Sequence, residues 1–218
     1  MVTHLAAAND YAVSHLRSPD VWALVQQARV YFVGGYHLTV CPAAVMALAH
    51  EAAEKDKVFM LSLSAPFIAQ FFKAQLDETS GFWDYVVGNE EEVRAYAEGC
   101  GWGTKEVGEI ARRMAELPKV NGGRKRVVVV TQGTEETVVA VQGEGGVRAF
   151  KVHEVEKERI VDTNGAGDAF AGGFVAGIVQ GKSLEECVDM GQWLASLSIT
   201  ELGPSYPSPK QTYKPRSS

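Results

Sequence analysis

The chain has 218 residues, of which 46% are hydrophobic and 22% charged, with a net charge of −6 and a pI near 5.4. This length and composition are sufficient for one folded domain with a sizeable core. The acidic balance argues against a nucleic-acid partner, because binding to a phosphate backbone needs clustered Lys and Arg. The basic cluster at residues 124–126 is short and fits a solvated turn before a strand.

Cysteine usage and hydropathy indicate the cellular compartment of the protein. Cys41, Cys100 and Cys187 lie far apart and form no Cys-x-x-Cys pair, which fits reduced thiols in a cytosolic protein. No apolar run approaches the length of a membrane span, and the first residues lack the layout of a signal peptide. We therefore expect a soluble protein of the cytoplasm, with the nucleus as an alternative, and no membrane contact.

Strand and helix patterns alternate along the first part of the chain. Residues 1–5 are typical of a strand, but no turn or cap introduces the segment that follows. We therefore expect the sequence to begin inside a longer domain. Ser18 as N-cap and Pro19 in the first turn predict a helix start. The patterns then predict a buried strand at 30–33, a helix at 42–53, strands at 58–63 and 85–87, and helices at 66–76, 90–97 and 104–117. This alternation predicts a parallel sheet with helices on its faces.

The pattern changes after the clearest central strand, at residues 126–131. Strand patterns at 136–141 and 147–151, joined by glycine-rich residues, predict a hairpin. Helices are expected at 167–180 and 183–200, the second with Ser183 and Glu186 as a capping box. We expect one domain over residues 1–207 and a disordered, proline-rich tail at 208–218.

The most informative stretch is Asp-Thr-Asn-Gly-Ala-Gly-Asp-Ala-Phe, residues 162–170, between a β-branched pair and a helical pattern. Gly165 and Gly167 permit positive φ angles, so that successive N–H groups point into one concavity. A helix that begins near Gly167 adds its first four unpaired N–H groups and the positive end of its dipole. The turn is therefore a candidate anion site.

Asp168 places a carboxylate in this same turn. A carboxylate opposes simple storage of phosphate, but it suits a base that accepts a hydroxyl proton while the oxygen attacks phosphorus. In a short motif of this kind, an acidic residue that merely caps the helix is the commoner case. Phe170 stands where a dinucleotide-binding motif needs its last glycine, and the sequence has no P-loop, His-Glu-x-x-His or Gly-x-Ser-x-Gly motif.

The nine-residue string resembles the C-terminal signature of the ribokinase-like, or PfkB, carbohydrate and nucleoside kinases. Residues 5–9, 63–67, 88–90 and 131–133 narrow the resemblance to the adenosine kinases, over about residues 5–207. It implies an α/β three-layer fold with a mostly parallel sheet, and transfer of the ATP γ-phosphoryl group to the 5′-hydroxyl of adenosine in purine salvage, with Mg²⁺ and with K⁺ as a further candidate. The full-length kinases are expected to be monomers.

The resemblance also assigns roles to individual residues. It makes Asp168 the base and Gly165, Ala166 and Gly167 the anion hole. Asn89 and Glu92 match an Asn-x-x-Glu motif that organises water around Mg²⁺ and the nucleotide phosphates, although from composition alone they are an N-cap with an acidic first turn.

The remaining positions concern the two substrates. Thr131 and Gly133 match residues along ATP, and Gln192 one near its adenine, although alone it would be a surface residue. Tyr36 and Phe67, in loops after strands, match aromatic positions around the nucleoside base, and core packing is an equal alternative. Asn164 is a substrate-binding candidate, and with Asp162 it resembles residues near a monovalent-cation site.

Two alternatives to adenosine kinase remain open. One is a ribokinase-like or fructokinase-like sugar kinase of the same family. The other is a nucleotide-binding fragment or regulatory partner without catalysis, because the lid, the first strands and the sugar-holding residues of adenosine kinases are not visible upstream. The chain thus resembles only their C-terminal portion, and we expect weak or no turnover from it alone.

Overall fold

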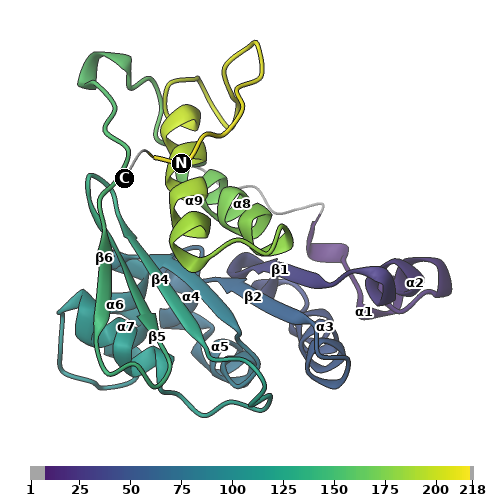
Figure 1. Ribbon diagram of the computed structural model, residues 1–218. Coiled ribbons are helices and arrows are strands. Elements are labelled where there is room, and N and C mark those ends of the chain that lie inside the picture. Colours follow the sequence, from purple (N-terminus) through teal and green to yellow (C-terminus); the bar gives the residue numbers. More distant parts are fainter. Residues whose placement is uncertain (1–7, 217–218) are drawn as a thin grey trace. The chain divides into compact units, whose positions relative to one another are not determined.

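The computed structural model describes residues 8–216 (Figure 1). The chain divides into two compact units. Unit 1 comprises Met1–Val130 and Val139–Val147, and unit 2 comprises Thr131–Val138 and Arg148–Ser218. The strand expected at residues 1–5 lies outside the described residues. The expectation of one domain over residues 1–207 stays a prediction.

The strands form a sheet in which they follow one another in chain order. They are β1 (Val30–Gly34), β2 (Val58–Ser62), β3 (Tyr85–Asn89), β4 (Val127–Gln132), β5 (Glu135–Val141) and β6 (Val147–Phe150). β1 pairs in parallel with β2, and β2 with β3. The two-residue connection from β4 to β5 joins them as antiparallel neighbours, because a parallel pair needs a long crossover. The expected mostly parallel α/β fold is confirmed.

Three helical segments of unit 1 precede β1: the short 3-10 helix η1 (Ala8–Asp10), α1 (Val13–Leu16) and α2 (Pro19–Gln27). The others connect the strands: η2 (Gly35–Thr39), also 3-10, and α3 (Pro42–Glu54) between β1 and β2, α4 (Pro66–Phe71) and α5 (Lys73–Ser80) between β2 and β3, and α6 (Glu90–Gly99) and α7 (Val107–Ala115) between β3 and β4. Right-handed crossovers between strands in sequential order bring the connecting helices to one face, where α3 packs on β1 and β2 and α6 on β3. The carboxyl ends of β1, β2 and β3 lead into the loops that carry the candidate residues of this unit.

Three sequence expectations in unit 1 were wrong in detail. The helix expected at 66–76 breaks at Phe72, whose φ of −121° and ψ of 28° leave the helical region. The strand at 30–33 is not fully buried, since β1 lies at the edge of the sheet and Phe32 is 41% exposed. Ser18 precedes α2 as expected, but its hydroxyl donates to the His15 carbonyl (2.7 Å) instead of capping the helix.

Arg126 is a fully buried cation in unit 1. Its guanidinium donates to backbone carbonyls of Ser80 (2.6 Å), Leu117 (2.5 Å) and Pro118 (3.0 Å), and its Nε donates to that of Trp83 (3.3 Å). Burial lowers the pKa of Arg126 to about 10, so the group stays charged at neutral pH. The side chain therefore ties the start of β4 to the ends of α5 and α7.

Unit 2 is built around a close helix pair. Its elements are η3 (Lys157–Arg159), α8 (Ala166–Val179) and α9 (Leu184–Ser198). A Cβ on Gly173 would collide with the Met190 carbonyl, and one on Gly177 would lie 2.7 Å from Cys187 Sγ. Glycine at these positions lets the backbones of α8 and α9 approach closely. On α8, the rings of Phe170 and Phe174 stack on each other, with centroids 6.1 Å apart.

The described part of the tail, up to Arg216, contains no helix or strand, but it makes side-chain contacts with unit 2. Its expected disorder stays a prediction. Among the described residues, no helix combines the length and apolar character needed to cross a membrane.

Candidate active site

The turn before α8 has the backbone that its glycines suggested, with one difference. Gly165 is the N-cap residue and is left-handed (φ 83°), where a Cβ would also approach Pro204 to 3.3 Å. Gly167 does not have a positive φ, because α8 already begins at Ala166. A Cβ on Gly167 would have no neighbour within 4 Å, so the space in front of this residue is open.

Most N–H groups at this helix start have no partner. Ala166 donates to the Thr163 carbonyl (3.3 Å), whereas within residues 8–216 nothing accepts from the N–H groups of Gly165, Gly167 or Asp168. Three of the first four N–H groups are thus free, where the sequence predicted four. Together with the helix dipole, they make this turn suitable for an anion.

Asp168 is exposed, and within residues 8–216 its carboxylate has no hydrogen-bond or ion-pair partner. It is the third residue of α8, the position from which an acidic side chain in a capping box reaches back to the N-cap N–H, yet the helix has no side-chain cap. The alternative that Asp168 serves as a cap has therefore no support in its contacts. The carboxylate is accessible to a ligand.

A cavity of about 500 Å³ lies beside this turn, within unit 2. Ala166 and Gly167 line it together with the predicted nucleotide residues Thr131, Gly133 and Gln192. Apolar walls come from Phe170 of the signature string and from side chains to which the sequence assigned no role: Val152, Val155, Ile160 and Ile199. A cavity of this size, with apolar walls and a few polar groups, is typical of sites for small organic ligands.

Gln192 is buried at 6% exposure, so the alternative of a plain surface glutamine was wrong, while its place near the ATP adenine stays a prediction. Its Nε2 donates to Thr137 Oγ1 (3.0 Å) and to the Phe150 carbonyl (3.2 Å), and its Oε1 accepts from Arg216 Nη2 (2.9 Å). The cavity wall therefore contains an amide of fixed orientation.

Asp162 is bound into its own loop. One carboxylate oxygen accepts from the N–H of Asn164 (2.9 Å) and the other from that of Gly203 (3.1 Å). These hydrogen bonds hold the pKa of Asp162 below its ordinary value of 3.8. The contacts give Asp162 a structural role, its role at a monovalent-cation site stays a prediction, and Asn164 is exposed beside the turn.

In unit 1, Asn89 and Glu92 form a complete capping box at the start of α6. Glu92 N–H donates to Asn89 Oδ1 (2.9 Å), and Asn89 donates through its N–H and its Nδ2 to the two Glu92 carboxylate oxygens, each at 3.0 Å. Gly88 allows this packing, since a Cβ there would lie 2.9 Å from Glu92 Oε2. The structure confirms the capping interpretation, and the metal-organising role of these residues stays a prediction.

Tyr36 and Phe67 come together in unit 1, with ring centroids 5.7 Å apart in an edge-to-face arrangement. Tyr36 lies in η2 and Phe67 in the first turn of α4, rather than in open loops. The Gly35 N–H donates to Ser64 Oγ (2.8 Å), and a Cβ on Gly35 would lie 2.7 Å from the Ser62 and Leu63 carbonyls. The segments after β1 and β2 are thus joined, and both half-buried rings are held by them.

Some residues at or near the cavity belong to no sequence motif, and the sequence analysis did not identify them. His153 and Thr137 line the cavity, and Arg216 contacts Gln192 from 24 positions away. No periodicity or spacing connects these residues, because only the folded chain brings them together. Within residues 8–216, no three His, Cys, Asp or Glu side chains are grouped to hold a metal ion.

The family model for pfkB family carbohydrate kinases matches residues 1–211. The chain belongs to this family. It is 46% identical over 213 residues to the adenosine kinase of Schizosaccharomyces pombe, and 44% identical over 207 residues to adenosine kinase 1 of Arabidopsis thaliana. These matches cover 98% and 95% of the chain, but 62% and 60% of the relatives' own length.

Solved structures give the same result. The adenosine kinase of Anopheles gambiae, in complex with P1,P4-di(adenosine-5) tetraphosphate, matches with a TM-score of 0.87 and 41% identity over 92% of this chain and 60% of that one. The Schistosoma mansoni adenosine kinase with 2-fluoroadenosine matches with a TM-score of 0.89 and 35% identity, over 93% and 59%. The ribokinase-like fold and the resemblance to adenosine kinases are thereby confirmed.

Proposed function

We propose that this pfkB-family chain is the nucleotide-binding and catalytic portion of an adenosine kinase, which transfers the γ-phosphoryl group of ATP to the 5′-hydroxyl of adenosine. The observation that carries the proposal is the start of α8, where free N–H groups, an exposed carboxylate and a cavity adjoin. The similarity to adenosine kinases supports the choice of acceptor.

Asp168 is the proposed base. An exposed carboxylate without a partner in the described chain is available to accept the proton of a hydroxyl group as its oxygen attacks phosphorus. The N–H groups of Gly165, Gly167 and Asp168 stabilise the charge that gathers on the transferred group, as fixed donors do at other phosphoryl-transfer sites. Ala166 contributes less than expected, because its N–H already donates to Thr163.

The nucleoside part of ATP fits the cavity of unit 2, beside Thr131, Gly133 and Gln192. Apolar walls suit the faces of a purine, and the free N–H groups at one end suit the phosphates. In unit 1, the Tyr36 and Phe67 pair offers flat apolar surface to the base of adenosine.

The Asn89 and Glu92 capping box could supply one carboxylate, that of Glu92, to a magnesium ion. The capping hydrogen bonds fix the orientation of the Glu92 carboxylate, and a single carboxylate suits an ion that keeps most of its waters and is held mainly by phosphates. Bound there through water, Mg²⁺ would neutralise phosphate charge. K⁺ near Asp162, monomeric state, a role in purine salvage and a cytoplasmic location belong to the same proposal.

Calorimetry on the purified chain tests the two halves of the site separately. We expect Mg·ATP to bind, through the cavity and turn of unit 2, and adenosine to bind weakly, because the chain spans only 62% of its fission-yeast relative. Absence of Mg·ATP binding would contradict the proposed function.

Adenosine, ribose and fructose compared as acceptors in one phosphorylation assay separate the proposal from a sugar kinase. A solved probable sugar kinase of Rhizobium etli has the same fold at 26% identity, whereas the adenosine kinases of Schizosaccharomyces pombe and Anopheles gambiae match at 46% and 41%, which favours the nucleoside. We expect little turnover from this chain alone and a preference for adenosine in any form that turns over. Nucleotide binding without any turnover would favour a non-catalytic fragment.

A further inference from the structure

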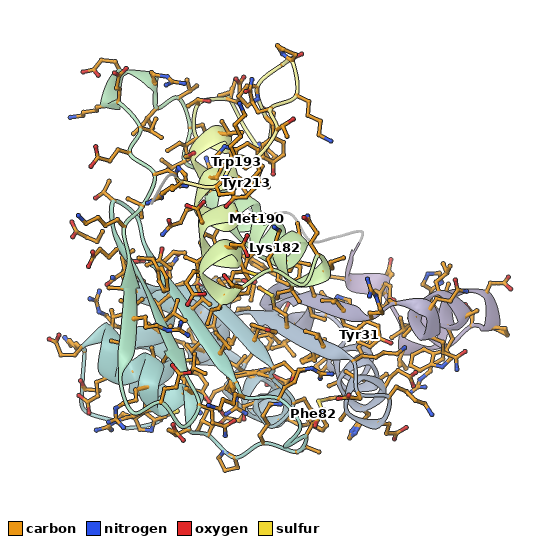
Figure 2. All side chains as sticks on the ribbon, viewed as in Figure 1. Tyr31, Phe82, Lys182, Met190, Trp193 and Tyr213 are labelled. Atoms are coloured by element: carbon orange, nitrogen blue, oxygen red, sulfur yellow. The ribbon has the colours of Figure 1, made fainter. Side chains whose placement is uncertain are left out.

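The C-terminal segment at residues 213–216, which we call the strap, contacts the outer side of the cavity wall in unit 2. Tyr213 donates its hydroxyl proton to Asp189 Oδ2 on α9 (2.6 Å), and its ring packs edge-on against Trp193 (centroids 5.5 Å apart) (Figure 2). Arg216 Nη1 donates to the Lys151 carbonyl (2.7 Å), and its Nε lies 2.9 Å from Asp189 Oδ1. The strap thus joins α9 to the segment after β6.

Arg216 also acts on a residue of the cavity itself. Its Nη2 donates to Gln192 Oε1 (2.9 Å) while Thr137 and Phe150 accept from Gln192 Nε2. A buried primary amide has two hydrogens to donate and an oxygen that accepts up to two hydrogen bonds. Both hydrogens are engaged by the protein, so only the oxygen has capacity left, for one more donor.

This capacity has a consequence for the ligand. Adenine presents an exocyclic amine, a donor, at the position where guanine presents a carbonyl, an acceptor. A Gln192 amide that can only accept favours the amine, and it opposes the carbonyl through like-sign partial charges. Without Arg216, the Phe150 carbonyl would be the remaining contact that opposes a turn of the amide, because Thr137 can accept or donate.

We infer that Arg216, through the strap, positions the Gln192 amide so that the nucleotide cavity prefers a nucleoside triphosphate with an amino-purine base. The inference rests on the proposed function, because it assumes that the phosphoryl donor binds in this cavity. Arg216 is a positioning residue, since it acts through Gln192. His153, whose Nε2 lies 2.8 Å from Asp189 Oδ1, and Asp189 itself hold the guanidinium in place.

The test compares dissociation constants of Mg·ATP and Mg·GTP for the 218-residue chain and three variants. Arg216→Ala removes the group that donates to Gln192 Oε1. Arg216→Lys keeps a positive charge but loses the planar guanidinium with its several N–H donors. Lys182→Ala is the matched control, because it removes an exposed cation of unit 2 that pairs with Glu186 (3.1 Å) near the other end of α9 (Figure 2).

We expect Arg216→Ala to reduce the preference for ATP over GTP by about five- to tenfold, in line with the loss of one hydrogen-bond orientation, and Arg216→Lys to recover part of it. Lys182→Ala should leave the preference unchanged. A merely structural strap would weaken both nucleotides equally, so an unchanged ratio in Arg216→Ala overturns the inference alone.

Two further outcomes are decisive. A wild-type chain that binds neither nucleotide overturns the proposed function and this inference together. If Arg216→Ala does not fold by circular dichroism, Tyr213→Phe replaces it, since this change removes only the hydroxyl that holds the strap to Asp189. We then expect a reduction of about two- to threefold in the same ratio, and no change would contradict the inference.

Discussion

The starts of α6 and α8 carry similar acidic turns and treat them in opposite ways. At α6, the side chains of Asn89 and Glu92 occupy each other's backbone N–H groups, and the box is largely buried. At α8, the N-cap is a glycine without a side chain, three N–H groups are free, and Asp168 is exposed without a partner among the described residues. One helix start is satisfied by its own side chains, and the other leaves three N–H groups to water or to a ligand.

This difference separates residues that stabilise the fold from residues available for chemistry. Buried polar groups in folded proteins nearly always have partners, so a helix end that lacks them stays solvated or binds something. α9 resembles α6, because Ser183 and Glu186 form a capping box there. Among these three helices, the exception is α8, which begins within the family signature.

The largest effect is expected from Asp168→Asn. In a form of the protein that phosphorylates adenosine, turnover should fall by about a hundred- to ten-thousand-fold, because the base is lost. Stability and ATP affinity should change little, since Asp168 makes no contact that holds the described fold. Turnover and calorimetric ATP titrations measure both.

Glu91→Gln is the matched control, as it neutralises an exposed first-turn carboxylate of α6. Equal losses of turnover and of ATP affinity in Asp168→Asn would instead mean that Asp168 has a structural role.

Asn89→Ala tests whether the α6 box is more than a cap. Loss of the cap should lower the free energy of unfolding by about 1–2 kcal/mol, and Ser183→Ala should do the same for α9 at about 1 kcal/mol. Urea unfolding measures this. If Asn89 also organises the nucleotide phosphates, Asn89→Ala weakens Mg·ATP binding whereas Ser183→Ala does not, and equal affinities would leave α6 as a cap alone.

The two glycines of the α8 turn should respond with opposite signs. Gly165→Ala forces a side chain into a left-handed backbone next to Pro204 and should cost about 1–2 kcal/mol of stability. Gly167→Ala has open space and a helical backbone, so it should add roughly 0.5–1 kcal/mol. Thermal unfolding distinguishes them, and a destabilised Gly167→Ala would show that the space is not open.

The smallest effect concerns pH. Because the folded state lowers the pKa of Asp162, its contribution to stability is present above the ordinary value of 3.8 and is lost as pH falls through the lowered value. Asp162→Asn should therefore be less stable than wild type at neutral pH, and the difference should shrink as the pH falls below 3.8 and through the lowered pKa. Urea midpoints across this range measure it, and a constant difference would contradict the assignment.

Local signals predicted most of the fold. The apolar runs of β2 and β4, the Pro at the start of α3 and the Ser183 capping box each specify their element through short-range chemistry. The break at Phe72 was missed because no Gly or Pro marks it between residues 67 and 80. Strand patterns at 126–131 and 136–141 left room for the turn between β4 and β5, where Gly133 has the positive φ of 59° that suits a tight turn.

The candidate site divides in the same way. The turn at residues 165–168 is contiguous, so the sequence contains nearly all of it. The burial of Gln192 depends on Thr137, Phe150 and Arg216, which are distant in the chain, and sequence alone therefore gave it the wrong surroundings.

The carbonyl cage around Arg126 has a consequence for the order of folding. Its guanidinium leaves water only when the carbonyls of Ser80, Trp83, Leu117 and Pro118 are all in position, since a buried cation with half its partners is strongly disfavoured. The segments at 80–83 and 114–118 must then close on β4 in a single step. In unit 1, this region is expected to form late and cooperatively, rather than residue by residue.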